Sequence, residues 1–288
     1  AVAALQAHVA VVRVAEEACR RVATLCLEEG NRQAVADAGL FEAAVAAMQA
    51  HLQVAGVQEH GCRALGFVCR GTDAAALARK QRAAGAGVLE AVVAAMQAHP
   101  QAMDVQQNGC AALGNVCHGT DAAALPRKQR AVEAGALEAV VAAMQAHPQA
   151  AGVQEQGCAV LGFVCYGTDA AGLARKQRAA EAGVLEAAVA AMQAHPQVAG
   201  VQQNGCAVLG HVFWGSDAAA LARKQRAVEA GALEAAVAAM QAHPQEVMVQ
   251  LQGCAALGFV CHGTDAAALA RKQRAVGAGG RGSVAAAM

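Results

Sequence analysis

The chain has 288 residues, and its 22 Lys and Arg balance 22 Asp and Glu, so no overall field favours nucleic acid or a membrane surface. Hydrophobic residues make up 56% of it, but many are alanines and only five Phe, one Tyr and one Trp are aromatic, which favours closely packed helices over a strand-rich core. The apolar runs are far shorter than the roughly 18 residues of a membrane span, so we expect no membrane insertion.

Near-identical segments recur along the chain. VQEQGCAVLGFVCYG occupies 153–167, and the Gly-Cys pairs that mark its copies begin at Gly61, Gly109, Gly157, Gly205 and Gly253, 48 residues apart each time. A divergent copy runs from Val14, with Cys19 and Cys26 at the usual interval. A fixed period of this size indicates a stacked array.

We therefore expect an all-α fold, a single right-handed superhelical solenoid over residues 1–288. Its expected parts are a partial repeat 1–39, repeats 40–86, 87–134, 135–182, 183–230 and 231–278, and a partial repeat 279–288. Both ends match the inside of a repeat, which suggests a piece of a longer protein or of an assembly.

The repeat that starts at Gly119 predicts three helices. Gly119 stops the preceding helix, Thr120 and Asp121 are expected to cap a first helix that ends near Gly135, and Leu137 to Met144 form one apolar stripe of a second. The second helix is expected to end at His147 and Pro148. A third helix is expected from about Ala151 to Tyr166, with its Val, Leu and Cys side chains pointing inward.

The string RAVEAGALEAVVAAM followed by VQEQGCAVLGFV resembles the armadillo repeat over nearly the whole chain, although the 48-residue copies are about five residues longer than usual. HEAT repeats are similar but usually have two helices. The resemblance implies that the third helices line a groove, where armadillo proteins use an Asn ladder to hold an extended peptide. Here only Asn115 keeps that residue.

Differences among the copies concentrate on one face of the predicted third helices. The variable positions carry Phe67, Asn115, Phe163, His211 and Phe259, and three residues later Arg70, His118, Tyr166, Trp214 and His262. Packed positions should repeat, whereas a surface that meets a non-repeating partner need not. We therefore expect these residues, with Arg63, to bind another protein, as a helix or hydrophobic segment in preference to an extended peptide. The alternative is that the Phe side chains pack against the next repeat.

The RKQR motif recurs at Arg79, Arg127, Arg175, Arg223 and Arg271. A solvated helix face is expected, and a basic ridge for phosphate or an acidic partner is the alternative, although nucleic acid is not our expected partner. A structural subunit of a larger assembly is a third possibility.

No motif indicates catalysis, so we expect no enzyme activity and no cofactor. Cys117 with His118 and Cys261 with His262 lack the spacing of a zinc site, and no metal is expected. Cysteines seven apart on a helix lie about 10 Å from each other, too far for a disulfide, which favours reduced thiols in an intracellular compartment.

Overall fold

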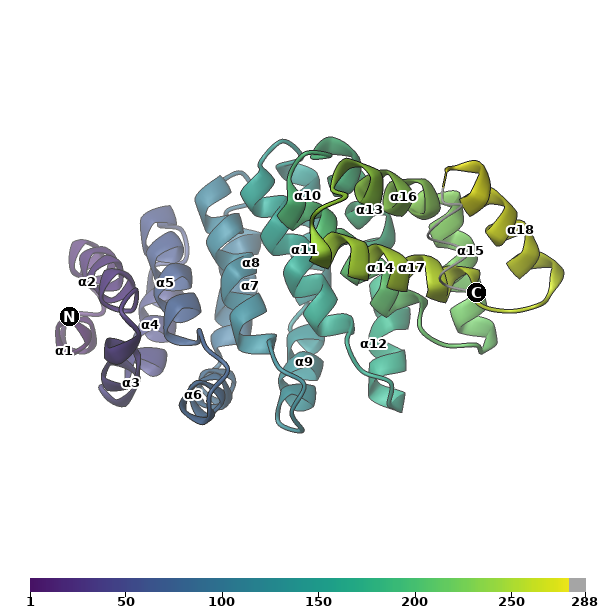
Figure 1. The fold of residues 1–288 in the computed structure, drawn as a ribbon. Coiled ribbons are helices and arrows are strands. Elements are labelled where there is room, and N and C mark those ends of the chain that lie inside the picture. The colour runs from purple at the N-terminus through teal and green to yellow at the C-terminus, as the bar shows by residue number, and fades with distance from the viewer. Residues whose placement is uncertain (280–288) are drawn as a thin grey trace. The chain divides into compact units, whose positions relative to one another are not determined.

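A computed structural model describes residues 1–279, which contain eighteen α-helices and no strand (Figure 1). Within each of the two compact units, most helices pack against the helices next to them in sequence, as in an α-solenoid. The chain divides into two compact units, Ala1–Ala146 and the part from His147 onward. Apart from Gly279, the partial repeat expected at 279–288 lies outside the described residues.

The first unit contains ten helices in its described residues. They are α1 Val2–Ala7, α2 Val12–Leu25, α3 Glu29–Asp37, α4 Leu40–Ala50, α5 Ala55–Val68, α6 Ala74–Gly85, α7 Val88–Ala98, α8 Met103–Cys117, α9 Ala124–Glu133 and α10 Ala136–Ala146. The longest, α2, α5 and α8, pack side by side. A second row contains α1, α4, α7 and α10, and a third contains α3, α6 and α9.

The second unit contains eight helices over residues 147–279. They are α11 Ala151–Cys165, α12 Ala170–Glu181, α13 Val184–Ala194, α14 Ala199–Phe213, α15 Ala218–Glu229, α16 Ala232–Ala242, α17 Val247–Cys261 and α18 Ala266–Gly277. Here α11, α14 and α17 pack side by side, as do α13 with α16 and α12 with α15. We call α2, α5 and α8 in one unit, and α11, α14 and α17 in the other, the long helices.

Glycines in the left-handed region make the turns between successive helices. Gly87 (φ 82°) stands directly before α7, and Gly119 (φ 133°) follows the end of α8. Residues with a Cβ rarely adopt this conformation, so the Ala-Gly and His-Gly turns of the repeated sequence are needed where they stand.

Small residues let the long helices approach their neighbours. A Cβ added to Gly109 would lie 2.6 Å from Cγ of Met96 on α7, and one added to Gly61 would lie 2.7 Å from Sδ of Met48 on α4. The Cys that follows each of these glycines is fully buried. The Gly-Cys pair is therefore a packing motif, with Gly for contact and Cys as a small core residue.

Buried Gln and His side chains hold the ends of the second-row helices. The Nε2 of Gln106 donates to the carbonyl oxygens of Met96 (2.9 Å) and His99 (2.8 Å). The Nε2 of His99 lies 2.7 Å from the carbonyl oxygen of Leu52 in the preceding repeat. His99 directly follows the last residue of α7, and its ring links two repeats.

The start of α9 differs from the prediction. In α6, α12, α15 and α18 an Asp caps the helix and accepts a hydrogen bond from the third residue after it, as Asp73 does from Ala76 at 2.6 Å. Asp121 was expected to do the same, but α9 begins only after Ala123, without a side-chain cap. Pro126 explains this late start. If the helix began at Ala122, the ring of Pro126 would clash with the carbonyl group of Ala122, four residues earlier.

Candidate partner-binding surface

Three of the aromatic side chains predicted to meet a partner are exposed, and all lie in the second unit. The exposed fractions are 41% for Tyr166, 36% for Trp214 and 37% for Phe259. Phe163 and His211 in that unit, and Phe67 and Asn115 in the first, are half-buried. Phe41 and Phe213 are fully buried. The variable positions therefore reach the surface, while the two aromatics at other positions belong to the core.

In the first unit, two guanidinium groups lie over the ring of Phe67 on α5. The Cζ atoms of Arg70 and Arg63 lie 4.1 Å and 5.5 Å from the ring centroid. Arg70 is exposed and Arg63 is half-buried. Partial burial, and then the nearby charge of Arg32, lower the pKa of Arg70. This cluster of Arg63, Phe67 and Arg70, which we call the arginine clamp, is a cation–π arrangement.

Elsewhere in the first unit the variable positions are more polar. Asn115 and His118 on α8 are both half-buried. Burial, followed by the charges of Lys80, Lys128 and Arg127, lowers the pKa of His118. The imidazole of His118 is therefore neutral at pH 7, and the cationic character of this surface lies on α5.

In the second unit, rings from neighbouring long helices contact each other. Tyr166, directly after α11, meets His211 of α14 edge to face, with ring centroids 5.4 Å apart. The Nδ1 of His211 lies 2.9 Å from the carbonyl oxygen of Gly162. His211 thus links two helices.

A hollow of about 370 Å³ opens in the second unit beside Trp214 and Phe259. Its lining combines apolar, polar and charged side chains: Leu173, Trp214, Gly215, Ser216, Asp217, Lys224, Phe259 and His262. The Nζ of Lys176 lies 5.5 Å from the centroid of the Trp214 ring. The hollow has the mixed apolar and polar lining that suits a side chain of a partner.

The RKQR motif is neither a solvated face nor a basic ridge, because its first two residues are buried. The exposed fractions are 3% for Arg79 and 1% for Lys80. The Nε of Arg79 donates to the carbonyl oxygen of Val68 at 2.8 Å, and Nζ of Lys80 donates to that of Gly71 at 2.8 Å. The same arrangement recurs at Arg127, Lys128, Arg175, Lys176, Arg223, Lys224 and Arg271. The arginines thus satisfy carbonyls at the ends of the long helices, and the lysines satisfy the carbonyl of the glycine that follows each of these ends.

The last Arg of the motif is exposed but forms ion pairs, as Arg82, Arg130, Arg226 and Arg274 show. Arg82 contacts Asp37 at 2.8 Å, and Arg130, Arg226 and Arg274 each lie 2.5 Å from a Glu of a second-row helix. Little unpaired charge remains for an extended anion on this row of helices.

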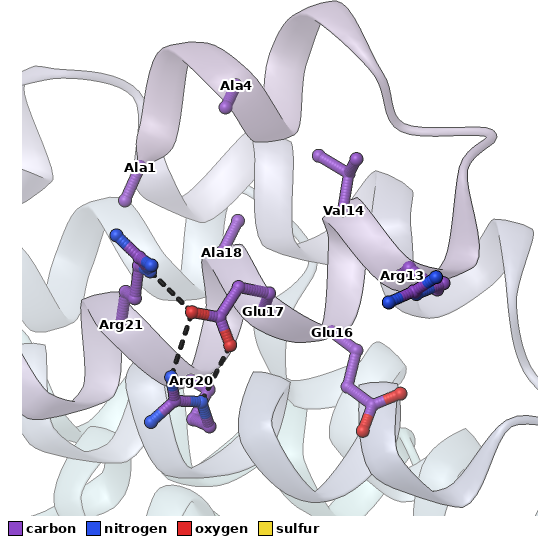
Figure 2. Close-up of a pocket in the computed structure, with 9 residues that line it drawn as sticks. All are labelled: Ala1, Ala4, Arg13, Val14, Glu16, Glu17, Ala18, Arg20 and Arg21. Carbon is purple, nitrogen blue, oxygen red and sulfur yellow. Dashed lines mark hydrogen bonds and ion pairs between the residues drawn. The ribbon is translucent and has the colours of Figure 1, made fainter.

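A second hollow lies on the outer side of α1 and α2 (Figure 2). Figure 2 shows Arg20 and Arg21 turned toward Glu17, whose carboxylate oxygens lie 2.8 Å from Nε of Arg20 and 2.5 Å from Nε of Arg21. These hydrogen bonds, from Arg20 first and Arg21 second, lower the pKa of Glu17 to about 2. Glu17 is therefore held ionised and poorly suited to accept or deliver a proton near neutral pH.

The described residues show no grouping of three or more His, Cys, Asp or Glu side chains that would suit a metal ion. Cys117 is buried while the adjacent His118 is half-buried, as expected for neighbours on a helix. Cys254 is half-buried and the other ten cysteines are buried.

Comparison of the chain with family models, curated proteins and solved structures found no match. Within residues 1–279, none of the helices is both long enough and apolar enough to traverse a bilayer.

Proposed function

We propose that this chain is a non-catalytic scaffold of armadillo-type three-helix repeats, whose long helices bind a segment of a partner protein. Each repeat would consist of a short first helix, a second-row helix and a long helix, and the long helices would line the binding surface. Its repetition also favours a binding role, since an active site needs one asymmetric set of groups, whereas binding along a row of helices does not.

The observation that carries the proposal is the exposure of Trp214 and Phe259 beside a hollow. Large aromatics at such positions are the residues that most often dominate protein interfaces. Trp214 directly follows α14 and Phe259 lies on α17, so a ligand between them would contact two repeats at once.

The binding mode follows from what replaces asparagine at the variable positions. Phe163 and Phe259 offer apolar surface in the second unit, and they cannot hydrogen-bond to a peptide backbone. We therefore infer that the partner segment is helical or hydrophobic and inserts apolar side chains. No cofactor is needed for this role. The ten buried thiols suit a reducing compartment, which we propose as the setting of the protein.

The experiment is a selection of helical and hydrophobic peptides from a display library on the intact chain, followed by calorimetry with variants. Trp214→Ala should weaken the selected peptides by about 30-fold, or roughly 2 kcal/mol, with little change in the thermal unfolding midpoint. Leu221→Ala is the matched control, because Leu221 is a 38% exposed apolar residue on α15, outside the long helices. Peptides that bind equally well to both variants would contradict the proposal.

A further inference from the structure

We infer that the arginine clamp on α5 recognises a carboxylate-bearing segment of the partner protein, so that the bound segment carries acidic side chains next to an apolar one. The inference rests on the proposed scaffold function and adds the chemistry of the partner. It concerns the first unit alone.

The ring of Phe67 restricts the two guanidinium groups of the arginine clamp before any anion binds. Arg70 and Arg63 both stack against Phe67, with their Cζ atoms 4.1 Å and 5.5 Å from the ring centroid. Stacking on an aromatic ring restricts a guanidinium and leaves the N–H groups at its edge available to an anion. An arginine restricted before binding loses less conformational entropy when it meets a carboxylate.

Among the described residues, no carboxylate pairs with the arginines of the clamp, whereas the exposed Arg20 and Arg82 of the same unit each form an ion pair. Arg20 meets Glu17 at 2.8 Å and Arg82 meets Asp37 at 2.8 Å. Within residues 1–279 neither Arg63 nor Arg70 has a carboxylate oxygen within 4.0 Å. Glu59, one helical turn before Arg63, instead lies 3.4 Å from Nδ1 of His60.

A third cation strengthens the positive potential here. Arg32 on α3 contributes to the lowered pKa of Arg70, after burial. Its own side chain donates to the carbonyl oxygens of Cys26 (3.0 Å) and Leu27 (3.4 Å). The site therefore gathers three guanidinium groups, and an anionic ligand would relieve their mutual repulsion.

The clamp departs from the repeated sequence. At the position of Arg63 the later copies have alanine, at Ala111, Ala159, Ala207 and Ala255. At the position of Arg70 they have His or an aromatic residue. Neither arginine is thus required by the packing of the repeat, since the four later copies form the same helices without them.

An acidic protein segment fits this site better than nucleic acid does. Strong nucleic-acid binding needs many phosphate contacts along a row of cations, and the RKQR cations are buried or paired. Aromatic stacking of a base would need a free ring face, whereas arginines lie over Phe67. Two guanidinium groups beside an apolar ring match one or two anionic side chains next to an apolar one.

The test uses fluorescence anisotropy with a panel of short peptides, each made with Glu-Glu-Leu, Gln-Gln-Leu or two phosphoserines before Leu at its centre. The proteins are the full chain, its Arg63→Gln/Arg70→Gln variant and an Arg82→Gln/Arg130→Gln variant. This last variant removes the same charge from exposed, ion-paired positions of the same unit.

We expect the Glu peptides to bind the full chain at least 10-fold more tightly than the Gln peptides. Arg63→Gln/Arg70→Gln should abolish that preference and Arg82→Gln/Arg130→Gln should keep it. Tighter binding of the phosphoserine peptides than of the Glu peptides would contradict recognition of a carboxylate. Phe67→Leu, with its helicity checked by circular dichroism, should weaken the Glu peptides several-fold because the arginines lose their support.

Several results would overturn the inference. These are no binding of any acidic peptide, an equal loss in the Arg82→Gln/Arg130→Gln variant, or tighter binding of a single-stranded oligonucleotide than of the Glu peptides. If Gln and Glu peptides bind alike but Trp214→Ala weakens both, the scaffold function stands and the acidic partner does not.

Discussion

Arg223 on α15 donates from its Nε to the carbonyl oxygen of Val212, near the end of α14, at 3.1 Å. Its other nitrogens reach the carbonyl oxygen of Trp214 (3.3 Å) and Oε1 of Gln177 (3.3 Å). One buried cation thus satisfies the end of a long helix, holds the backbone of an exposed aromatic and contacts the preceding repeat.

Arg223→Ala should therefore lower the free energy of unfolding by about 3 kcal/mol, because buried carbonyls lose their donor. Arg226→Ala, three residues later in the same helix, should cost less than about 1 kcal/mol, since Arg226 forms an exposed ion pair with Glu186. Urea unfolding of both variants measures the difference. Equal costs would mean that the burial of Arg223 contributes nothing.

The burial of the first two residues of RKQR was not predicted from the sequence. Helix ends and inward faces follow from local pattern, so the stripe from Leu137 to Met144 and the ends of α10 and α11 were predicted correctly. Whether a charged side chain is buried depends on neighbours outside its own helix, here a carbonyl group 11 residues earlier. One signal was present for its first two residues, because RKQR is identical in all five copies, although the invariant last Arg is exposed.

On the long helices, the expectation that positions differing between copies lie at the surface was more informative. It predicted that Tyr166, Trp214 and Phe259 reach the surface, and their exposed fractions of 36–41% agree. It could not predict the stacking of Arg70 on Phe67 or the contact between Tyr166 and His211, because both depend on rotamers.

A neighbouring pair of glutamines on α8 separates a buried role from an exposed one. Gln106 is 1% exposed and bonds to two carbonyl oxygens at the end of α7, whereas Gln107 is exposed. Gln106→Ala should lower the free energy of unfolding by about 2 kcal/mol, and Gln107→Ala should change it by less than about 0.5 kcal/mol. Chemical denaturation of the two variants checks this, and a cost for Gln107→Ala as large as that for Gln106→Ala would contradict it.

The buried thiols predict a loss of stability in alkali. Burial raises the pKa of Cys69, Cys110 and Cys206 to about 12, from the ordinary value of 9.0 for a thiol in water. Above pH 9 the folded chain therefore holds more protons than the unfolded chain, and its stability falls as the pH rises toward 12. Burial also lowers the pKa of Lys176 to about 8, which acts in the opposite direction between about pH 8 and 10.5.

The cysteines should dominate because they are more numerous and their shifts are larger. Unfolding free energies measured from pH 7 to 11 should decline above pH 9, with a shallower decline in Cys110→Ala than in the unchanged chain. A thiol reagent should modify Cys254, which is half-buried, before the others. A pH-independent stability above pH 9 would show that the thiols ionise alike in both states.

Pro126 offers a test of why one helix starts late. In Pro126→Ala, α9 should extend back to Ala122 with Asp121 as its cap, as Asp73 caps α6. The net change in stability is a poor measure, since losing a proline also frees the unfolded chain. The better measure is the loss of unfolding free energy caused by Asp121→Ala. This loss should be about 1 kcal/mol larger in the Pro126→Ala variant, where Asp121 would cap α9, than in the unchanged chain. In the unchanged chain Asp121 does not cap the helix, and its Oδ2 lies 3.6 Å from Nη2 of Arg127. Amide exchange at Leu125 should slow in Pro126→Ala, because its N–H would donate to the carbonyl oxygen of Asp121, as that of Leu77 does to Asp73. An unchanged rate would mean that another residue delays the helix.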